Sequence, residues 1–292
     1  MPKLALIQHS CSDSPDKNRQ LIERKIVDAA ENGAQLVLLQ ELHNSVYFCQ
    51  NEDASHFDLA ETIPGPSTEF FGRLAEQHKL VLVCSLFEKR ARGLYHNTAV
   101  VFDRSKTMAG IYRKMHIPDD PGYYEKYYFT PGDIGFEPIE TSVGKLGVLI
   151  CWDQWFPEAA RLMALKGADI LLYPTAIGWD QNDNKQEQQR QQEAWITVQR
   201  GHAIANGVFV AACNRIGLEA DPSGHTAGSQ FWGNSFICDP QGAILAQADD
   251  QNETILTAEI DFNRIEQVRR IWPYFRDRRI DGYGDILKRY AD

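Results

Sequence analysis

The sequence lacks any apolar run long enough to cross a membrane, and it has no excess of positive charge. A membrane helix needs roughly 18 or more apolar residues, and the N-terminal stretch MPKLALIQHS has too few in a row for the core of a signal peptide. Its 30 basic and 40 acidic residues give a net charge of −10. That balance argues against nucleic-acid binding, which depends on Lys and Arg. We therefore expect a cytoplasmic protein with neither a membrane nor a nucleic acid as partner.

Cysteine is present, but not in any pattern that holds a metal. No CxxC occurs, and no cysteine stands at a short, zinc-like spacing from a histidine. In a reducing compartment disulfides are not expected either, so most cysteines should be small buried apolar residues. The six are Cys11, Cys49, Cys84, Cys151, Cys213 and Cys238.

Several catalytic and nucleotide-binding motifs are also missing. The chain has no GxxxxGK[ST], no GxGxxG and no HExxH, which leaves phosphate-loop, dinucleotide and zinc-protease functions without support. The GxSxG motif of many serine hydrolases is absent as well. We therefore expect an activity that uses no cofactor.

What the chain does contain is an alternation of short apolar segments with helical patterns. Leu36–Leu39 is continuously apolar, as expected for a strand covered on both faces, and 157–166 is typical of a helix that starts at a proline. Strands within 97–113 and 231–260 are joined too closely for crossover helices. We predict an α/β protein of α and β layers, with a mixed sheet or a pair of sheets, in one domain over 1–292.

Three ionisable residues follow apolar strands directly, and these are Glu41, Lys114 and Cys151. The ends of strands in an α/β sheet present side chains to a crevice where ligands bind. Taken singly, a Glu or Lys in this position is usually a solvated surface residue, and a Cys is usually part of the core. Together they supply a base, a cation and a nucleophile, which is the set that acyl transfer requires.

The segments around these residues resemble a known family. LLQELHNSVYFC (38–49), YRKMHIPDD (112–120), YFTPGD (128–133) and GVLICWDQWFPEAAR (147–161) are similar to the nitrilase, or carbon–nitrogen hydrolase, superfamily. The resemblance spans essentially the whole chain in the order Glu, Lys, Cys. HIPDDPGYYEKYYFTPGD and GSQFWGNSFI are most similar to the N-carbamoylputrescine amidohydrolases within it.

The resemblance implies a four-layer αββα sandwich that assembles as a homo-oligomer. It implies Cys151 as nucleophile, Glu41 as general base, Lys114 as the cation that stabilises the oxyanion, and Glu125 as a second glutamate that supports positioning and proton transfer. The backbone N–H of Trp152 is a further candidate oxyanion donor. The tail 262–292, rich in arginine and aromatics, is expected to be a solvated extension or to make subunit contacts.

Candidate pocket residues come from carboxylates and aromatics near these motifs, and they are Asp119, Asp120, Glu88, Tyr124, Trp155 and Trp179. The carboxylates are candidate anchors for a distant ammonium and the aromatics candidate lining, although solvated loop acids and core aromatics are the commoner cases. A papain-like Cys–His pair with His116 or His202 is conceivable, but nothing in the local sequence places either beside Cys151.

The function predicted from these features is a thiol amidohydrolase that cleaves N-carbamoylputrescine to putrescine, ammonia and carbon dioxide through an acyl-enzyme, in polyamine biosynthesis. The alternatives are another N-carbamoyl amidase of the β-ureidopropionase type, an aliphatic amidase, or a non-catalytic binding member of the fold. The four candidate catalytic residues are all present, which counts against the last of these.

Overall fold

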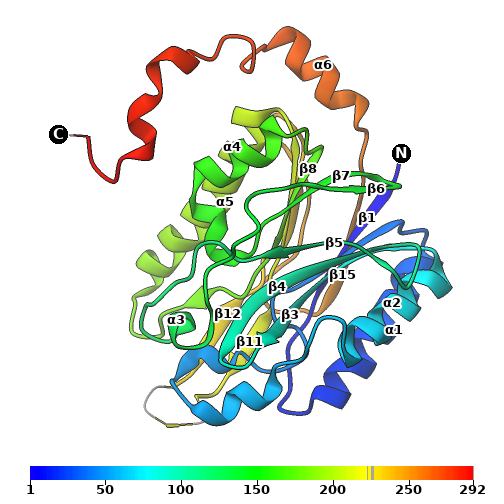
Figure 1. The fold of residues 1–292 in the computed structure, drawn as a ribbon, viewed down its shortest axis with the longest axis vertical. Helices are drawn as coiled ribbons and strands as arrows, with labels where there is room; N and C mark the ends of the chain where they lie inside the picture. Colours follow the sequence, from blue (N-terminus) through cyan, green and yellow to red (C-terminus); the bar gives the residue numbers. More distant parts are fainter. Residues whose placement is uncertain (222, 225–226, 292) are drawn as a thin grey trace.

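The computed structural model describes residues 1–221, 223–224 and 227–291, and its strands form three sheets (Figure 1). The first six-stranded sheet has the order β15-β1-β2-β3-β4-β5, and the second has the order β14-β13-β10-β8-β7-β6. A small third sheet has the order β11-β12-β9.

The strands of the first sheet are β1 (Lys3–Gln8), β2 (Leu36–Leu39), β3 (Val81–Ala91), β4 (Leu94–Asp103), β5 (Met108–Arg113) and β15 (Thr254–Glu259). Those of the second are β6 (Ile139–Thr141), β7 (Gly144–Val148), β8 (Ile170–Pro174), β10 (Phe209–Cys213), β13 (Phe236–Cys238) and β14 (Ile244–Gln247). The third holds β9 (Gly178–Trp179), β11 (Ile216–Glu219) and β12 (Ser229–Trp232).

The α-helices are α1 (Pro15–Glu31), α2 (Pro66–His78), α3 (Glu125–Tyr128), α4 (Pro157–Leu165), α5 (Lys185–Asn206) and α6 (Asn263–Ile271). Ser14 caps α1 by accepting a hydrogen bond from the backbone of Lys17, and a proline stands in the first turn of α1, α2 and α4. Both features favour helix initiation because they suit backbone groups that have no partner within the helix.

Alternate residues of the first sheet point to two different cores. Leu4 and Leu6 of β1 pack toward the second sheet, in the cluster that also holds residues of α4 and α5. Ala5 and Ile7 of the same strand pack against α1 and α2. This alternation places two sheets face to face between two pairs of helices (Figure 1). The predicted fold class, an αββα sandwich, is confirmed.

The sequence pattern missed five short strands and the full length of one helix. We did not anticipate β6, β9, β11, β12 or β14, because two to four residues are too few to show a period. The polar stretch 181–192, read as a lead into a helix, lies mostly within α5, which begins at Lys185. All six cysteines are free, and five of them are buried.

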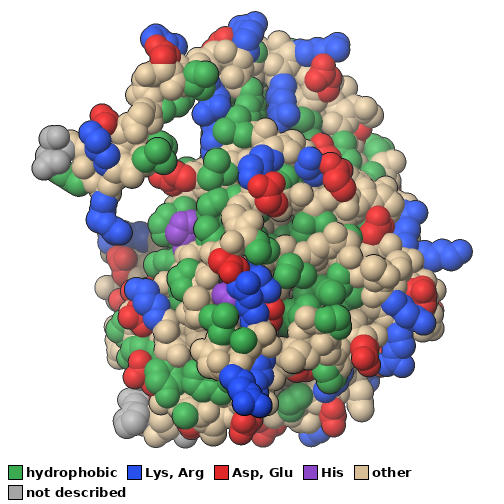
Figure 2. All heavy atoms as spheres, viewed as in Figure 1, with side chains coloured by type: hydrophobic (Ala, Val, Ile, Leu, Met, Phe, Trp, Pro, Cys, Tyr) green, Lys and Arg blue, Asp and Glu red, His purple; other side chains and the backbone are tan. Residues whose placement is uncertain are grey.

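The C-terminal tail, 262–292, extends along the outside of the molecule. In Figure 1 α6 and the segment after it arch over the end of the molecule and past α4, where the guanidinium of Arg161 lies 5.0 Å from the ring of Phe275. Its apolar side chains include some of the most exposed of the described residues, such as Leu287 at 91% and Tyr290 at 80%. Figure 2 shows basic and acidic side chains interspersed over the visible face, so the acidic excess forms no single patch there. Among the described residues, no helix is both long and apolar enough to span a bilayer.

Candidate active site

The two sheets deliver the candidate catalytic residues from opposite sides. Glu41 follows β2 and Lys114 follows β5, so both come from the first sheet. Cys151 comes from the second sheet, where it begins a short 3₁₀ turn after β7. Glu125 is the first residue of α3, within the long connection between β5 and β6. The chain therefore brings four distant segments to the junction of the two sheets.

Lys114 lies at the centre of this site. Its Nζ donates to Oε1 of Glu41 at 2.8 Å and to Oε2 of Glu125 at 2.7 Å. All three side chains have 0% exposure. Burial opposes the charge of Lys114, but the two carboxylates raise its pKa well above the usual value, so it is an ammonium. Two of its three N–H groups are occupied, which leaves one for a third acceptor.

The two oxygens of Glu41 are in different surroundings. Oε1 accepts from Lys114 and from Nδ2 of Asn97, the latter at 2.7 Å. Oε2 is buried and has no hydrogen-bond partner. An unpartnered buried carboxylate oxygen costs free energy, and in native proteins it calls for an explanation. Here it is a buried acceptor that no donor among the described residues occupies.

Glu125, by contrast, is bonded through both oxygens. Tyr47 donates its phenolic O–H to Oε1 at 2.6 Å, while Lys114 donates to Oε2. Burial raises the pKa of Glu125 to about 7, and the charge of Glu41 adds to the rise while Lys114 opposes it. This carboxyl group therefore changes protonation near neutral pH.

The Cys151 thiol stands beside the same cluster. Its Sγ donates to the carbonyl of Ala176 at 3.8 Å. Thr175, the residue before Ala176, accepts from the backbone N–H of Glu41 at 3.3 Å, so the same segment contacts both Cys151 and Glu41. Burial raises the pKa of Cys151 well above its usual value; the charge of Glu41 adds to this, and that of Lys114 opposes it. The resting thiol is thus protonated, and a nearby base must remove its proton before it attacks.

The backbone of Cys151 is held in the left-handed region, with φ of +44°. Such a conformation persists only where its surroundings enforce it, and it clusters at functional sites. Asp153 supplies the restraint, because its carboxylate accepts from the backbone of Ile150 at 2.9 Å and from the hydroxyl of Tyr112 at 2.9 Å. His116 bonds to the same carboxylate through Nδ1 at 2.7 Å. That contact ties the segment after Lys114 to the turn that holds the thiol.

The other candidates lie around this cluster in different ways. Asp119 and Asp120 are exposed, outside the buried cluster. Glu88 is engaged by Arg113, which leaves the suggested role as an ammonium anchor without support. His116 and His202 bond to Asp153 and Gln154, which lie within the 3₁₀ turn that begins at Cys151. The partly buried aromatics are Tyr124, Trp152, Trp155 and Trp179.

Sequence reasoning missed four polar residues that touch this cluster or its backbone, and these are Tyr47, Asn97, Asp153 and Arg215. Arg215 stands two residues after β10, so the strand-end rule that found Glu41 also applies to it. Asn97 and Tyr47 gave no such signal, because one lies within a strand and the other in a loop. Within the described ranges, no three His, Cys, Asp or Glu side chains form a group that could hold a metal ion.

Comparison with known proteins places this geometry in context. The model of the carbon–nitrogen hydrolase family matches residues 3–270. A citrullinase from Francisella tularensis is 43% identical over 99% of both chains. An N-carbamoylputrescine amidase from rice, Oryza sativa, is 44% identical over 97% of this chain and 94% of its own.

Solved structures of carbon–nitrogen hydrolases and amidases are also similar to this chain. A carbon–nitrogen hydrolase from Helicobacter pylori G27 is 55% identical, with a TM-score of 0.97 and 99% of both chains covered. An amidase from Nesterenkonia sp. AN1, in a mutant form, carries a covalent adduct of fluoroacetamide at its active-site cysteine. It is 25% identical, with a TM-score of 0.75, and the match covers 96% of this chain and 94% of that one.

Proposed function

The chain belongs to the carbon–nitrogen hydrolase family, and we propose that it hydrolyses N-carbamoylputrescine with Cys151 as the nucleophile. The observation that carries the chemical part is the buried cluster of Glu41, Lys114 and Glu125 beside a protonated thiol. It combines a carboxylate oxygen without a partner, an ammonium with a free N–H and a nucleophile, which are the parts that amide hydrolysis needs.

In the proposed first step, Oε2 of Glu41 takes the proton of the Cys151 thiol as sulfur attacks the ureido carbonyl. The C–S bond forms and the carbonyl electrons move to oxygen. The third N–H of Lys114 and the backbone N–H of Trp152 stabilise that oxyanion, where the loss of one donor typically costs roughly 3–4 kcal/mol. Glu125 keeps Lys114 in place through its hydrogen bond.

In the second step the tetrahedral intermediate collapses. The C–N bond breaks, and Glu41 returns the proton to the departing nitrogen, which leaves a thioester on Cys151. Glu41 then accepts a proton from water as the water oxygen attacks the thioester. The C–S bond breaks, and Glu41 returns this proton to sulfur, which restores the thiol and releases a carbamic acid. The carbamic acid loses carbon dioxide to give the second amine, so putrescine, ammonia and carbon dioxide are the final products whichever nitrogen leaves first.

The charges in the interior support a substrate with a distant ammonium and no carboxylate. Among the described residues the buried cations are Arg113, Lys114 and Arg215, and each is already bonded to a glutamate. A substrate carboxylate would therefore meet no free buried cation. N-carbamoylputrescine carries an ammonium and no carboxylate, in keeping with this interior.

Citrulline is the second candidate, because the Francisella relative is a citrullinase at similar identity. Citrulline has the same ureido group, the same spacing and the same distal ammonium as N-carbamoylputrescine. The two differ by a single carboxylate on the carbon that bears the ammonium. The pair therefore isolates the one charge on which the substrate proposal depends.

The test is ammonia release from N-carbamoylputrescine, citrulline, N-carbamoyl-β-alanine and an aliphatic amide. We expect kcat/KM for N-carbamoylputrescine to exceed the values for both carboxylate-bearing compounds by about a hundredfold or more, since an unpaired buried charge costs several kcal/mol. Equal or higher efficiency with citrulline would refute the substrate and leave the thiol mechanism standing.

A labelling experiment tests the nucleophile by itself. Sub-stoichiometric iodoacetamide should alkylate Cys151 first and remove activity in proportion, because this thiol is the one beside an unpartnered carboxylate. Partly exposed Cys11 is the internal control. Activity lost through labelling at Cys11 or Cys238 would refute the assignment, and failure of stoichiometric labelling would favour a non-catalytic binding protein.

We further propose one domain over 1–292, in which the tail 262–292 contributes to contacts within a homo-oligomer. The exposed apolar side chains of the tail support this proposal. A cytoplasmic role in polyamine biosynthesis follows from the proposed substrate. Light scattering of the full chain and of a chain ending at 261 is the test, and the same mass per particle in both would contradict the role of the tail.

A further inference from the structure

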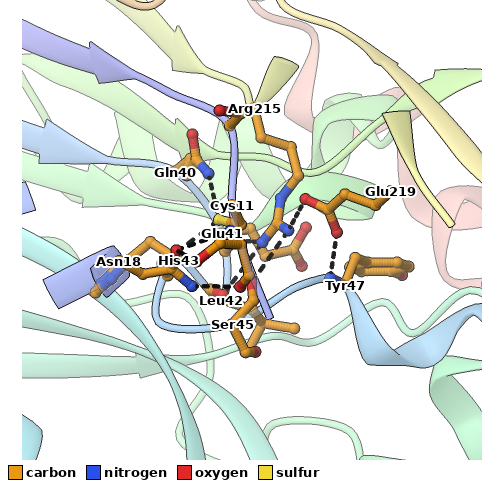
Figure 3. A network of polar contacts seen from close by, with 12 residues as sticks. Cys11, Asn18, Gln40, Glu41, Leu42, His43, Ser45, Tyr47, Arg215 and Glu219 are labelled. Carbon is orange, nitrogen blue, oxygen red and sulfur yellow. Dashed lines mark hydrogen bonds and ion pairs between the residues drawn. The ribbon is translucent and has the colours of Figure 1, made fainter. Parts of the chain in front are cut away.

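Arg215 is a fully buried arginine whose guanidinium is surrounded by the loop that carries Glu41 (Figure 3). It lies between β10 and β11 in the chain. Its Nη2 donates to the carbonyl of Glu41 at 2.7 Å and to that of Leu42 at 3.1 Å. Its Nη1 donates to the carbonyl of Ser45 at 3.3 Å. One side chain thus holds three carbonyls of the loop after β2.

Leu42 shows why the loop needs that support. Its φ is +47°, in the left-handed region that an L-residue with a branched side chain avoids. Its N–H donates to Oγ of Ser85 at 3.2 Å, while its carbonyl accepts from Arg215. Leu42, the strained residue directly after Glu41, is therefore held by hydrogen bonds at both its N–H and its carbonyl. Its conformation sets the path of the backbone at Glu41.

Glu219, at the end of β11, extends the restraint to the second carboxylate. Its Oε1 accepts from Arg215 at 2.7 Å, and its Oε2 accepts from the backbone N–H of Tyr47. Hydrogen bonds thus link the ion pair to the backbone of Glu41 on one side and to the backbone of Tyr47 on the other (Figure 3). The hydroxyl of Tyr47 extends this link to the carboxylate of Glu125.

The terminal N–H groups of Arg215 all bond within the protein. A guanidinium has five N–H groups, and the four on Nη1 and Nη2 are matched by the carbonyls of Glu41, Leu42 and Ser45 and the carboxylate of Glu219. The rings of Phe231, at 5.2 Å, and Tyr47, at 5.9 Å, lie against the group. The fifth N–H, on Nε, is buried and has no hydrogen-bond partner, so the terminal N–H groups hold the loop and Glu219.

We propose that the Arg215–Glu219 pair is a positioning pair, which sets both carboxylates on Lys114 and thereby determines the rate of turnover. The proposal rests on the proposed catalytic roles of Glu41 and Glu125. A buried ion pair can contribute to the stability of the fold, to the geometry of the site, or to both. The proposal is that this pair contributes to the geometry of the site.

The experiment compares Arg215→Met, Glu219→Gln and the double variant. Each single change leaves one buried charge without its partner and should lower the unfolding midpoint, whereas the double change removes both charges and should restore much of it. We expect kcat of the double variant to remain about ten- to a hundredfold below wild type with KM within about threefold, because misplaced groups slow the chemical step. A double variant with wild-type kcat would overturn the proposal.

Arg215→Lys keeps the counter-charge for Glu219 but offers three N–H groups in place of five. It should fold with a midpoint close to wild type and still lose kcat, and wild-type kcat here would also overturn the proposal. Arg269→Met is the matched control, because Arg269, on α6, lies away from this network: it donates to the carbonyl of Asn206 and lies over the ring of Phe275. We expect its kcat to be unchanged.

A second readout keeps this test separate from the substrate assignment. The rate of Cys151 alkylation by iodoacetamide, followed by mass spectrometry, needs no knowledge of the substrate and depends on how Glu41 and Lys114 face the thiol. It should fall in the double variant and in Arg215→Lys. If wild type fails on N-carbamoylputrescine, the substrate proposal fails alone; unchanged alkylation rates in both variants would refute the positioning pair.

Discussion

Two buried charge clusters lie at the end of β5, on consecutive residues, and they are built differently. Arg113 faces Glu88, to which it donates from Nε and from Nη2, both at 2.7 Å. Lys114, the next residue, points the other way and meets Glu41 and Glu125. Successive residues at a strand end face opposite sides, so one short segment supplies two clusters.

The difference lies in balance. Burial opposes the ionisation of Glu88, but hydrogen bonds from Arg113 and Thr98 outweigh it, and the pKa of Glu88 is lowered. In the other cluster two carboxylates share one ammonium, the pKa of Glu125 is raised to about 7, and one oxygen of Glu41 has no partner. The first cluster is balanced, because Asp133 and Arg90 add one charge of each sign to the Arg113–Glu88 pair. An unbalanced cluster keeps a proton acceptor available at the expense of stability.

The largest expected effect separates Glu41 from Glu88. Glu41→Gln removes the proton acceptor, and we expect kcat/KM to fall about a thousandfold or more. Its unfolding midpoint should stay the same or rise, because Lys114 then faces one carboxylate instead of two. Ammonia release and thermal unfolding measure the two quantities. A variant with near-wild-type turnover would place Glu41 with the structural glutamates.

Glu125→Gln should have the next largest effect. The change keeps the shape but removes the charge and weakens the acceptor that holds Lys114, so we expect kcat/KM to fall on the order of a hundredfold. The unfolding midpoint should change little, because Glu41 still neutralises Lys114. Steady-state kinetics beside a melting curve is the measurement. Retained turnover would remove Glu125 from the site.

The pH dependence sharpens the comparison further. Protonation of Glu125 below its pKa of about 7 should reduce kcat/KM by about tenfold per pH unit, as an apparent pKa of the whole cluster with Glu41 and Lys114. The folded pKa lies above the usual value, so the contribution of this group to stability is present below about 4.5 and is lost as pH rises through about 7. Profiles of rate and of melting point measure both, and the same acidic limb in Glu125→Gln would contradict the assignment.

The smallest expected effect on turnover belongs to Glu88→Gln. It breaks the charge-assisted hydrogen bonds with Arg113 and should cost about 2 kcal/mol of stability, while Asp133 still faces the guanidinium at 3.3 Å. We expect kcat/KM to stay within about threefold of wild type. Denaturant unfolding gives the first number and ammonia release the second. A large loss of turnover in a folded variant would show that the two clusters are not independent.

The sequence predicted which segments form the candidate site, but it did not predict most of the hydrogen bonds between them. Strand ends placed Glu41, Lys114 and Cys151, because a short apolar strand followed by an ionisable residue is a local pattern. Glu125 lies in a loop, and only the resemblance pointed to it. Tyr47 and Asn97, the hydrogen-bond partners of Glu125 and Glu41, reach the site through the packing of distant segments. The pattern of a single segment cannot predict such packing.

The predicted fold class was confirmed, and it came from two sources. The alternation of apolar segments such as β1 and β2 with the helical period of α1 indicated an α/β protein, whereas the four-layer αββα arrangement came from the family resemblance. The third sheet was missed because its strands are held by tertiary pairing, such as Ile216 with Trp232 and Gln230 with Trp179. Its β11 carries Glu219, so the missed element is also the one that supplies half of the positioning pair.

The pairing of β1 with β15 has a consequence for how the protein is made. The two strands run antiparallel from Lys3 beside Glu259 to Gln8 beside Thr254. The ribosome therefore releases β1 long before its partner, because the rest of the two sheets lies between them in the chain. Until then one edge of β1 presents unpaired backbone N–H and C=O groups. A nascent chain that stalls before residue 254 cannot cover that edge, and we expect it to depend on chaperones or to aggregate.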